Sequence, residues 1–162
     1  MMYKTIKITQ RQREIAKRLY PFKALIGSVT NGESNIYGAL GEVVVKEYYE
    51  GKGLIVAHDN TYDYDLIVDG YKVDVKSKKT NYPPQPHFFS SIPSYNTKQK
   101  CDLYLFTMIR EDLSEAYLLG YKKKNAFYNE ATFNKKGEKD WNGWLFKTDC
   151  YNIRVDMLNP LK

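Results

Sequence analysis

Asp65, Asp74 and Lys76 are the residues whose types and spacing most clearly indicate chemistry. They lie in the stretch TYDYDLIVDGYKVDVKSK (61–78), where charged side chains interrupt two segments that otherwise have the composition of buried strands. Asp69-Gly70 between those segments is the strongest short signal for a β-hairpin with a two-residue type I′ turn. Because that turn fixes the register, the pairs can be counted outward, and Asp65 is expected directly opposite Asp74.

The register predicts a hairpin with one apolar face and one charged face, because directly opposed residues share a face of a sheet. The apolar face is expected to join the core, and it carries Tyr64, Leu66, Val68, Tyr71, Val73 and Val75. The charged face carries Asp65 opposite Asp74, and Asp63 opposite Lys76. Like charges directly opposite each other destabilise a hairpin, so something has to compensate for the two acids.

Two compensations are compatible with the hairpin. A hard divalent cation such as Mg²⁺ is held by one or two carboxylates together with waters and phosphate oxygens, so it would convert the repulsion into a binding site. Alternatively, the charged face is exposed to solvent, and Lys72 and Lys76 balance the acids by cross-strand pairing.

The spacing of these residues resembles the PD-(D/E)XK nuclease superfamily. Asp65, eight intervening residues and then Asp74-Val75-Lys76 match its motif, although Tyr64 stands where the eponymous proline would be. A second copy of the tripeptide, Glu50-Gly51-Lys52, ends a predicted helix and has no partner aspartate in a hairpin. The resemblance covers about residues 34–109.

A glutamate on the preceding helix extends the resemblance. Many members carry a glutamate on the helix before the β-meander, and Glu42 in the segment GALGE supplies one here. The neighbouring Gly38 and Gly41 would let a backbone or a ligand approach beside its carboxylate. The alternative is the ordinary fate of this residue type, a glutamate on an exposed helix surface.

The resemblance implies an α/β domain with a restriction-endonuclease-like core, a mixed β-sheet flanked by helices. It also implies a Mg²⁺-dependent DNA endonuclease, with Mn²⁺ able to substitute. Asp65 and Asp74 would then hold the metal together with the carbonyl of Val75, and Glu42 would complete the metal shell. Lys76 would orient the attacking water or stabilise charge on the phosphate. The residues expected to be catalytic are therefore Glu42, Asp65, Asp74 and Lys76.

The net charge of +6 is unevenly distributed. Residues 33–70 hold eight acids and two lysines, between basic flanks at 1–32 and 71–100. This pattern favours a carboxylate site set in a surface that attracts polyanions, although a mildly basic charge also serves solubility alone. The residues expected to contact nucleic-acid phosphates are Arg11, Lys17, Arg18, Lys78, Lys79, Lys98 and Lys100.

DNA, double-stranded or branched, is the expected partner, because it is the commoner substrate of the superfamily. A small catalytic domain without a reader domain resembles Holliday-junction resolvases, which act as dimers, so a homo-oligomer is expected and a dimer is favoured. Homing and phage-type endonucleases are also compatible. The alternative function is a non-catalytic nucleic-acid-binding module that retains the nuclease fold.

The location is expected to be cytoplasmic. Cys101 and Cys150 lack the spacing of a zinc cluster, which favours a reduced, intracellular protein. No apolar run near the N-terminus resembles a signal peptide, and no stretch approaches the length of a transmembrane helix.

One domain is expected over residues 1–162. It would open with a basic helix at 9–20, which a capping box of Thr9 and Gln12 begins and Pro21 ends. A Gly/Ser/Asn loop at 27–33 follows.

The catalytic core is expected over about 34–121. It would hold a second helix from Ser34 or Asn35 to about Tyr49, and strands at 54–57, 65–68, 71–76, 103–109 and 116–121. Residues 80–100 are predicted to be mostly loop, with a helical turn near 95–100. The C-terminal part, about 122–158, is predicted to hold a helix at 125–131 and a hairpin of 144–148 with 151–155.

Overall fold

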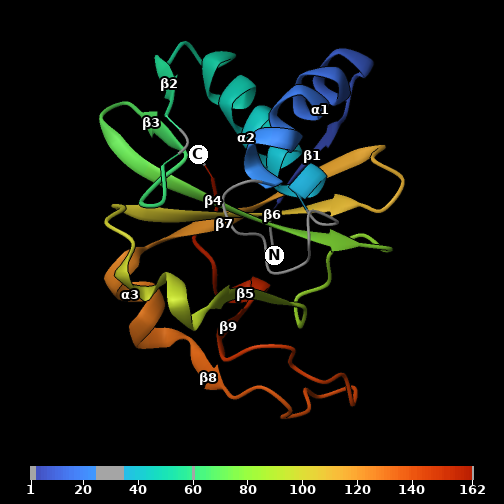
Figure 1. The fold of residues 1–162 in the computed structure, drawn as a ribbon, viewed down its shortest axis with the longest axis vertical. Helices are drawn as coiled ribbons and strands as arrows, with labels where there is room; N and C mark the ends of the chain where they lie inside the picture. Colours follow the sequence, from blue (N-terminus) through green and yellow to red (C-terminus); the bar gives the residue numbers. More distant parts are fainter. Residues whose placement is uncertain (1–2, 25–34, 60, 162) are drawn as a thin grey trace.

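The computed structural model describes residues 3–24, 35–59 and 61–161. It has an α/β fold, in which a mixed six-stranded sheet separates two long helices on one face from a smaller sheet and a short helix on the other (Figure 1). The predicted mixed α/β class is therefore confirmed. The loop predicted at 27–33 and the candidate helix cap Ser34 lie outside the described residues.

The elements agree broadly with the predicted order. The large sheet consists of β1 (Lys4–Lys7), β2 (Val56–His58), β3 (Leu66–Val68), β4 (Tyr71–Thr80), β6 (Leu103–Arg110) and β7 (Glu115–Lys123). The small sheet consists of β5 (Phe89–Pro93), β8 (Thr132–Asn134) and β9 (Cys150–Arg154). The helices are α1 (Gln10–Ala24), α2 (Asn35–Glu50) and α3 (Lys124–Glu130), with 3₁₀ turns η1 (Ser94–Lys98) and η2 (Val155–Met157).

The large sheet has the strand order β1-β7-β6-β4-β3-β2, in which β4 and β6 are parallel and the other neighbours are antiparallel. A parallel pair requires a crossover connection. Here the chain between β4 and β6 passes through β5 and η1, the helical turn predicted near 95–100, on the face opposite α2 (Figure 1). This crossover places both faces of β4 against other parts of the protein.

Helix α2 packs on β4 through one apolar face. Leu40 and Val44 are buried in one cluster with Val73 and Val75, which are alternate residues of β4. Alternation along a strand therefore turns the side chain of Asp74 to the opposite face of the sheet.

The close approach expected beside Glu42 occurs at Gly41. A Cβ atom at Gly41 would lie 1.9 Å from Oγ of Ser77 on β4, whereas one at Gly38 would meet nothing within 4 Å. Glycine at position 41 thus allows the backbone of α2 to approach the sheet at the point where Glu42 leaves the helix.

The predicted capping box at the start of α1 is confirmed. The N–H of Gln12 donates to Oγ1 of Thr9 at 3.1 Å, and the N–H of Thr9 donates to Oε1 of Gln12 at 2.9 Å. The predicted end is wrong, because α1 continues past Pro21 to Ala24. Proline removes a single intrahelical N–H bond, and with only three residues beyond it the helix accommodates that loss.

The C-terminal part of the chain differs from the prediction. β9 pairs with β5 and β8, whereas residues 144–148 form no strand. β5 itself lies inside the segment 80–100, which is therefore less of a loop than predicted. Ile92 of β5 and Ile153 of β9 are both buried in a second apolar cluster. Burial of these side chains favours the pairing of β9 with the distant β5 over a pairing with residues 144–148, where Trp144 is exposed.

None of the described helices is long and apolar enough to cross a membrane. Both cysteines, Cys101 and Cys150, are buried free thiols. Burial raises the pKa of Cys101 to about 11, so this thiol is uncharged at neutral pH.

Candidate functional site

The predicted register of the β3–β4 hairpin is confirmed as far as Leu66, which lies opposite Val73. The ladder then changes, because the N–H of Asp65 donates to the carbonyl of Val73 at 3.0 Å. Oδ2 of Asp65 accepts the N–H of Val75 at 2.9 Å, so a side chain takes the place of the next backbone acceptor. This bond holds the carboxylate of Asp65 against the middle of β4.

Both carboxylates of the predicted pair are buried, which rules out the alternative of a solvent-exposed charged face. Asp65 is 7% exposed and Asp74 is 3% exposed. Lys72, which that alternative needs as a partner for the acids, instead places its ammonium 5.5 Å from the ring centroid of Tyr64. Two core predictions are wrong. Tyr71 stands beside the turn at the end of the sheet and is 55% exposed, and Tyr64 packs against the second apolar cluster instead of the cluster that holds Leu66.

The carboxyl of Asp74 has a strongly perturbed proton affinity. Burial and, to a smaller extent, the nearby carboxylate of Asp65 raise its pKa, and the ammonium of Lys76 lowers it, with a net pKa of about 7. The two acids are therefore close enough to repel each other, which is the interaction expected from the hairpin.

Lys76 compensates for only part of this negative charge. Its Nζ lies 2.7 Å from Oδ2 of Asp74 and lowers the pKa of that carboxyl, yet the pKa stays well above its ordinary value. The same ammonium lies 5.7 Å from the ring centroid of Tyr104, which forms the adjacent wall.

Gln99 is a site residue that the sequence reasoning missed. Its Nε2 donates to the carbonyl of Tyr62 at 2.6 Å and lies 3.3 Å from Oδ1 of Asp74. Its Oε1 is buried and forms no hydrogen bond with a described residue. No periodicity marks this position, because it follows η1 in the proline-containing crossover.

Glu42 is buried, contrary to the alternative of a surface glutamate, and is only 1% exposed. Its Oε1 lies 3.0 Å from Nε2 of His58 on β2. His58 has no metal-ligand spacing in the sequence, yet its imidazole contacts the carboxylate of Glu42 and helps to orient it.

The predicted pairing of Asp63 with Lys76 is wrong. Because the ladder changes at Asp65, Asp63 turns away from β4, and its Oδ1 accepts the N–H of Lys100 at 2.9 Å. Asp63 thus helps to hold the crossover segment in place.

The donor set at Asp65 and Asp74 fits a hard divalent cation. Two buried carboxylates that repel each other beside a single lysine suit Mg²⁺, since this ion uses few protein carboxylates and keeps several waters. Among the described residues, no three His, Cys, Asp or Glu side chains form a metal-binding group. The fit therefore rests on the aspartate pair, and Glu42 as a ligand stays a prediction.

The basic residues predicted to contact phosphates lie on two faces of the large sheet. α1, which carries Arg11, Lys17 and Arg18, covers the same face as α2 (Figure 1). Lys78 shares the opposite face with Asp74, because the two occupy alternate positions of β4. The predicted contacts are therefore not gathered on one surface.

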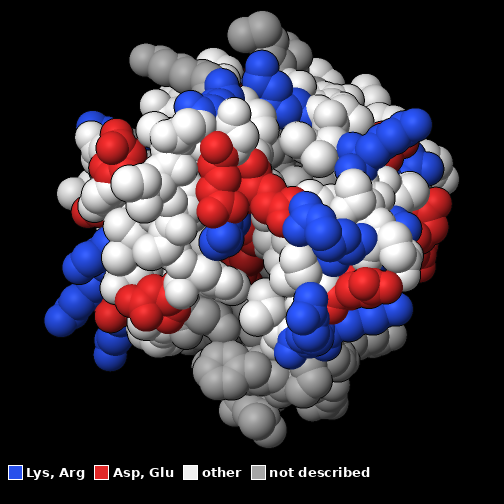
Figure 2. All heavy atoms as spheres, turned by 90° about the horizontal axis from the view of Figure 1, so that it is seen from above, with Lys and Arg blue, Asp and Glu red and all other residues white. Residues whose placement is uncertain are grey.

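Several of these cations have acidic partners. Arg11 forms two hydrogen bonds with the carboxylate of Glu47, at 2.7 and 2.8 Å, and Nζ of Lys79 lies 3.7 Å from Oε1 of Glu111. Figure 2 shows acidic and basic side chains close together on the face that it presents. All seven residues of the predicted set are exposed: Arg11, Lys17, Arg18, Lys78, Lys79, Lys98 and Lys100.

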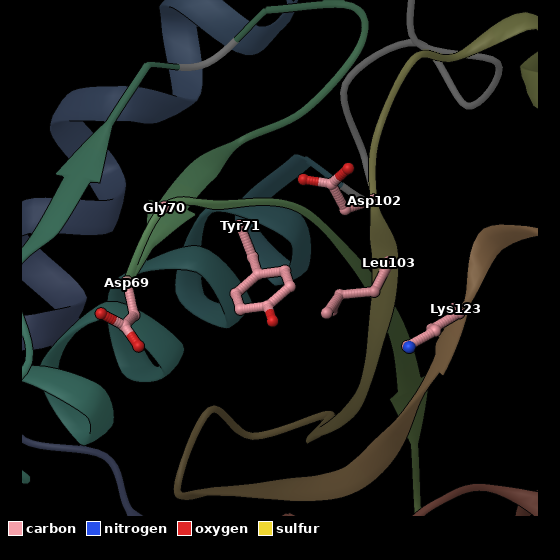
Figure 3. A pocket seen from close by; sticks show the side chains of 6 residues that line it. All are labelled: Asp69, Gly70, Tyr71, Asp102, Leu103 and Lys123. Atoms are coloured by element: carbon pink, nitrogen blue, oxygen red, sulfur yellow. The ribbon is translucent and has the colours of Figure 1, made fainter.

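A cavity of about 430 Å³ adjoins the site and is lined by Lys76, Lys78 and several aromatic residues. A separate pocket of about 480 Å³ lies at the other end of β4, lined by residues that include Tyr71, Asp102 and Lys123 (Figure 3). That second pocket contains none of the predicted catalytic residues. Of these two pockets, the cavity beside Lys76 is the one that includes a predicted catalytic residue.

No protein-family model matches this sequence, and no curated protein matches it significantly.

Proposed function

We propose that this protein is a metal-dependent endonuclease that hydrolyses phosphodiester bonds in DNA. The observation that carries the proposal is the buried pair of Asp65 and Asp74 beside the ammonium of Lys76. Burying two like charges is costly, and a divalent cation is the ligand that offsets this cost. The order of α2, the β2-β3-β4 meander and the parallel strand β6 further supports a restriction-endonuclease-like core.

Each side chain has a role in this proposal. Asp65 and Asp74 hold Mg²⁺ with the carbonyl of Val75, and Mn²⁺ substitutes. When bound, the ion polarises the scissile phosphate and lowers the pKa of a water molecule. Lys76 stabilises the negative charge that develops on the phosphate, and Glu42, oriented by its contact with His58, supplies a further oxygen donor.

A second candidate function is a module that binds nucleic acid without cutting it. It is favoured by the absence of a three-ligand metal group among the described residues. In either case a homodimer, as in small resolvases, would present two equivalent sites to two strands.

Cleavage assays on duplex, branched and single-stranded DNA test the proposal. With Mg²⁺ or Mn²⁺ we expect the wild type to cut at least one substrate, and Lys76→Ala to lower the rate about 100-fold or more. Lys72→Ala is the matched control on the same strand, and its rate should stay within about threefold. A wild type that cuts none of the substrates would contradict the enzymatic function, and equal rates for both variants would contradict the site.

A further inference from the structure

The cavity beside Lys76 has the size of a site for one small molecule. It lies between the two sheets, where β4 contributes Lys78, β5 contributes Phe89, and the segment at 140–148 contributes Trp144. Its volume of about 430 Å³ falls within the range of roughly 300–1,000 Å³ that is typical of ligand pockets. A single nucleotide fits such a volume, whereas a DNA duplex does not.

Strand β4 connects this cavity to the carboxylate pair. Asp74, Lys76 and Lys78 occupy alternate positions, so their side chains leave the same face of the sheet. Lys76 both contacts Asp74 and lines the cavity. A ligand that fills the cavity therefore has one end next to the proposed cleavage site.

The cations of the cavity favour an anionic ligand. The side chain of Lys78 as a whole is exposed, but its ammonium is turned inward and donates to the carbonyl of Phe89 at 3.1 Å. Of the described carboxylates, none lies within salt-bridge distance of this ammonium, although Asp140 is near enough to raise its pKa against the lowering effect of burial. Lys147 also lines the cavity, so three lysines face one acid there.

The remaining walls are rich in aromatic rings. Phe89, Phe106, Phe146 and Trp144 line the cavity, and Trp144 is 68% exposed. Aromatic side chains stack on nucleobases of any sequence, and lysines bind the phosphates between them. The combination matches the chemistry of a nucleotide whose base is not paired.

We propose that this cavity binds one unpaired nucleotide of single-stranded nucleic acid, with its base on Trp144 and its phosphate toward Lys76 and Lys78. The inference rests on the proposed function, because it names the form of substrate that the nuclease site receives. A duplex keeps its bases stacked inside the helix, so it does not offer one to the cavity.

The chain contains two tryptophans, which makes the proposal directly measurable. Trp141 is also exposed, but its ring makes an edge-to-face contact with His87, with centroids 4.9 Å apart, and it does not line the cavity. In Trp141→Phe, the fluorescence of Trp144 alone reports binding. Without metal, we expect a thymidine oligonucleotide to quench it, and a duplex of equal length to require about a tenfold higher concentration.

The matched variants are Trp144→Ala and Trp141→Ala, measured by fluorescence anisotropy of a labelled oligonucleotide. Trp144→Ala should weaken binding about tenfold and Trp141→Ala less than twofold, with both variants melting at the temperature of the wild type. Equal affinities of the two variants, or equally tight binding of duplex and single strand, would overturn the cavity assignment.

Cleavage with Mg²⁺ is measured separately from binding. Tight binding of the oligonucleotide without any cleavage would contradict the nuclease function alone. If the protein cleaves duplex DNA and Trp144→Ala cleaves it at the same rate, the cavity assignment alone is contradicted.

Discussion

At the scale of single residues, Asp74 carries a charge in an environment that disfavours it. Burial and the neighbouring Asp65 together raise its pKa to about 7, although Lys76 lies within ion-pair distance. A carboxyl group in this state is a cost to the folded protein unless a ligand uses the charge. This balance has measurable consequences for stability.

The variant Asp74→Asn is expected to be more stable than the wild type when no divalent metal is present. It removes the buried like-charge repulsion but keeps the size of the side chain, and the gain should be on the order of 2 kcal/mol near pH 8. Urea unfolding in EDTA measures it. A less stable variant would mean that the ion pair with Lys76 outweighs the repulsion from Asp65.

The stability difference between this variant and the wild type should depend on pH with a defined sign. The folded pKa of Asp74, about 7, lies above its ordinary value of 3.8, so the folded state holds the proton more tightly. The contribution of this proton to the free energy of unfolding has its full value below about pH 4 and is lost as the pH rises through about 7. The advantage of Asp74→Asn in EDTA should therefore grow between these two values and then level off. A difference that is constant with pH would contradict the assignment.

At the scale of elements, the packing of α2 on β4 depends on Gly41. Gly41→Ala should destabilise the protein by roughly 1–3 kcal/mol, because the new methyl group would overlap with Oγ of Ser77. Gly38→Ala is the control on the same helix. It meets open space and should raise stability by up to about 1 kcal/mol.

Thermal and urea unfolding of both variants measure these effects. Adding Ser77→Ala to Gly41→Ala should restore part of the loss, because it removes the atom that the methyl group meets. Equal effects of the two alanines would show that α2 does not approach the sheet as closely at Gly41 as described.

The hairpin could be predicted from the sequence because its information is local. Asp69-Gly70 fixes the turn, and the alternation of Leu66 with Val68 fixes the buried face. The departure of Asp65 from the ladder could not be predicted, because it depends on a side chain replacing a backbone acceptor at Val75. The pairing of β5 with β9 was missed for a related reason, since partners about 60 residues apart in the sequence leave no local signal.

The site residues divide in the same way. Asp65, Asp74 and Lys76 belong to one local motif, and the sequence indicates their proximity. His58 and Gln99 reach Glu42 and Asp74 only through tertiary packing, and neither has a spacing that indicates such a contact.

At the scale of the whole molecule, the positive charge is divided between the two faces of the large sheet. The exposed Lys17 and Arg18 lie on the α1 face, whereas Lys78 lies beside the proposed site. We expect Lys78→Met to weaken DNA binding severalfold and to reduce its salt dependence by about one phosphate contact. The double variant Lys17→Ala/Arg18→Ala should change affinity less. Binding measured across a salt series distinguishes the two, and a larger effect of the α1 variant would place the nucleic acid on the opposite face.

The most direct test of the central claim is the single-turnover cleavage rate of a labelled DNA substrate with and without Mg²⁺. The comparison is between Asp74→Asn and Asp63→Asn. Asp63 lies in the same sequence stretch, but its carboxylate accepts a hydrogen bond from the N–H of Lys100 and is not part of the proposed site. We predict Mg²⁺-dependent cleavage by the wild type, a loss of about 1,000-fold in Asp74→Asn, and a rate within about threefold of wild type for Asp63→Asn. Cleavage that persists in Asp74→Asn, or a wild type that does not cut with Mg²⁺ or Mn²⁺, would contradict the proposed nuclease site.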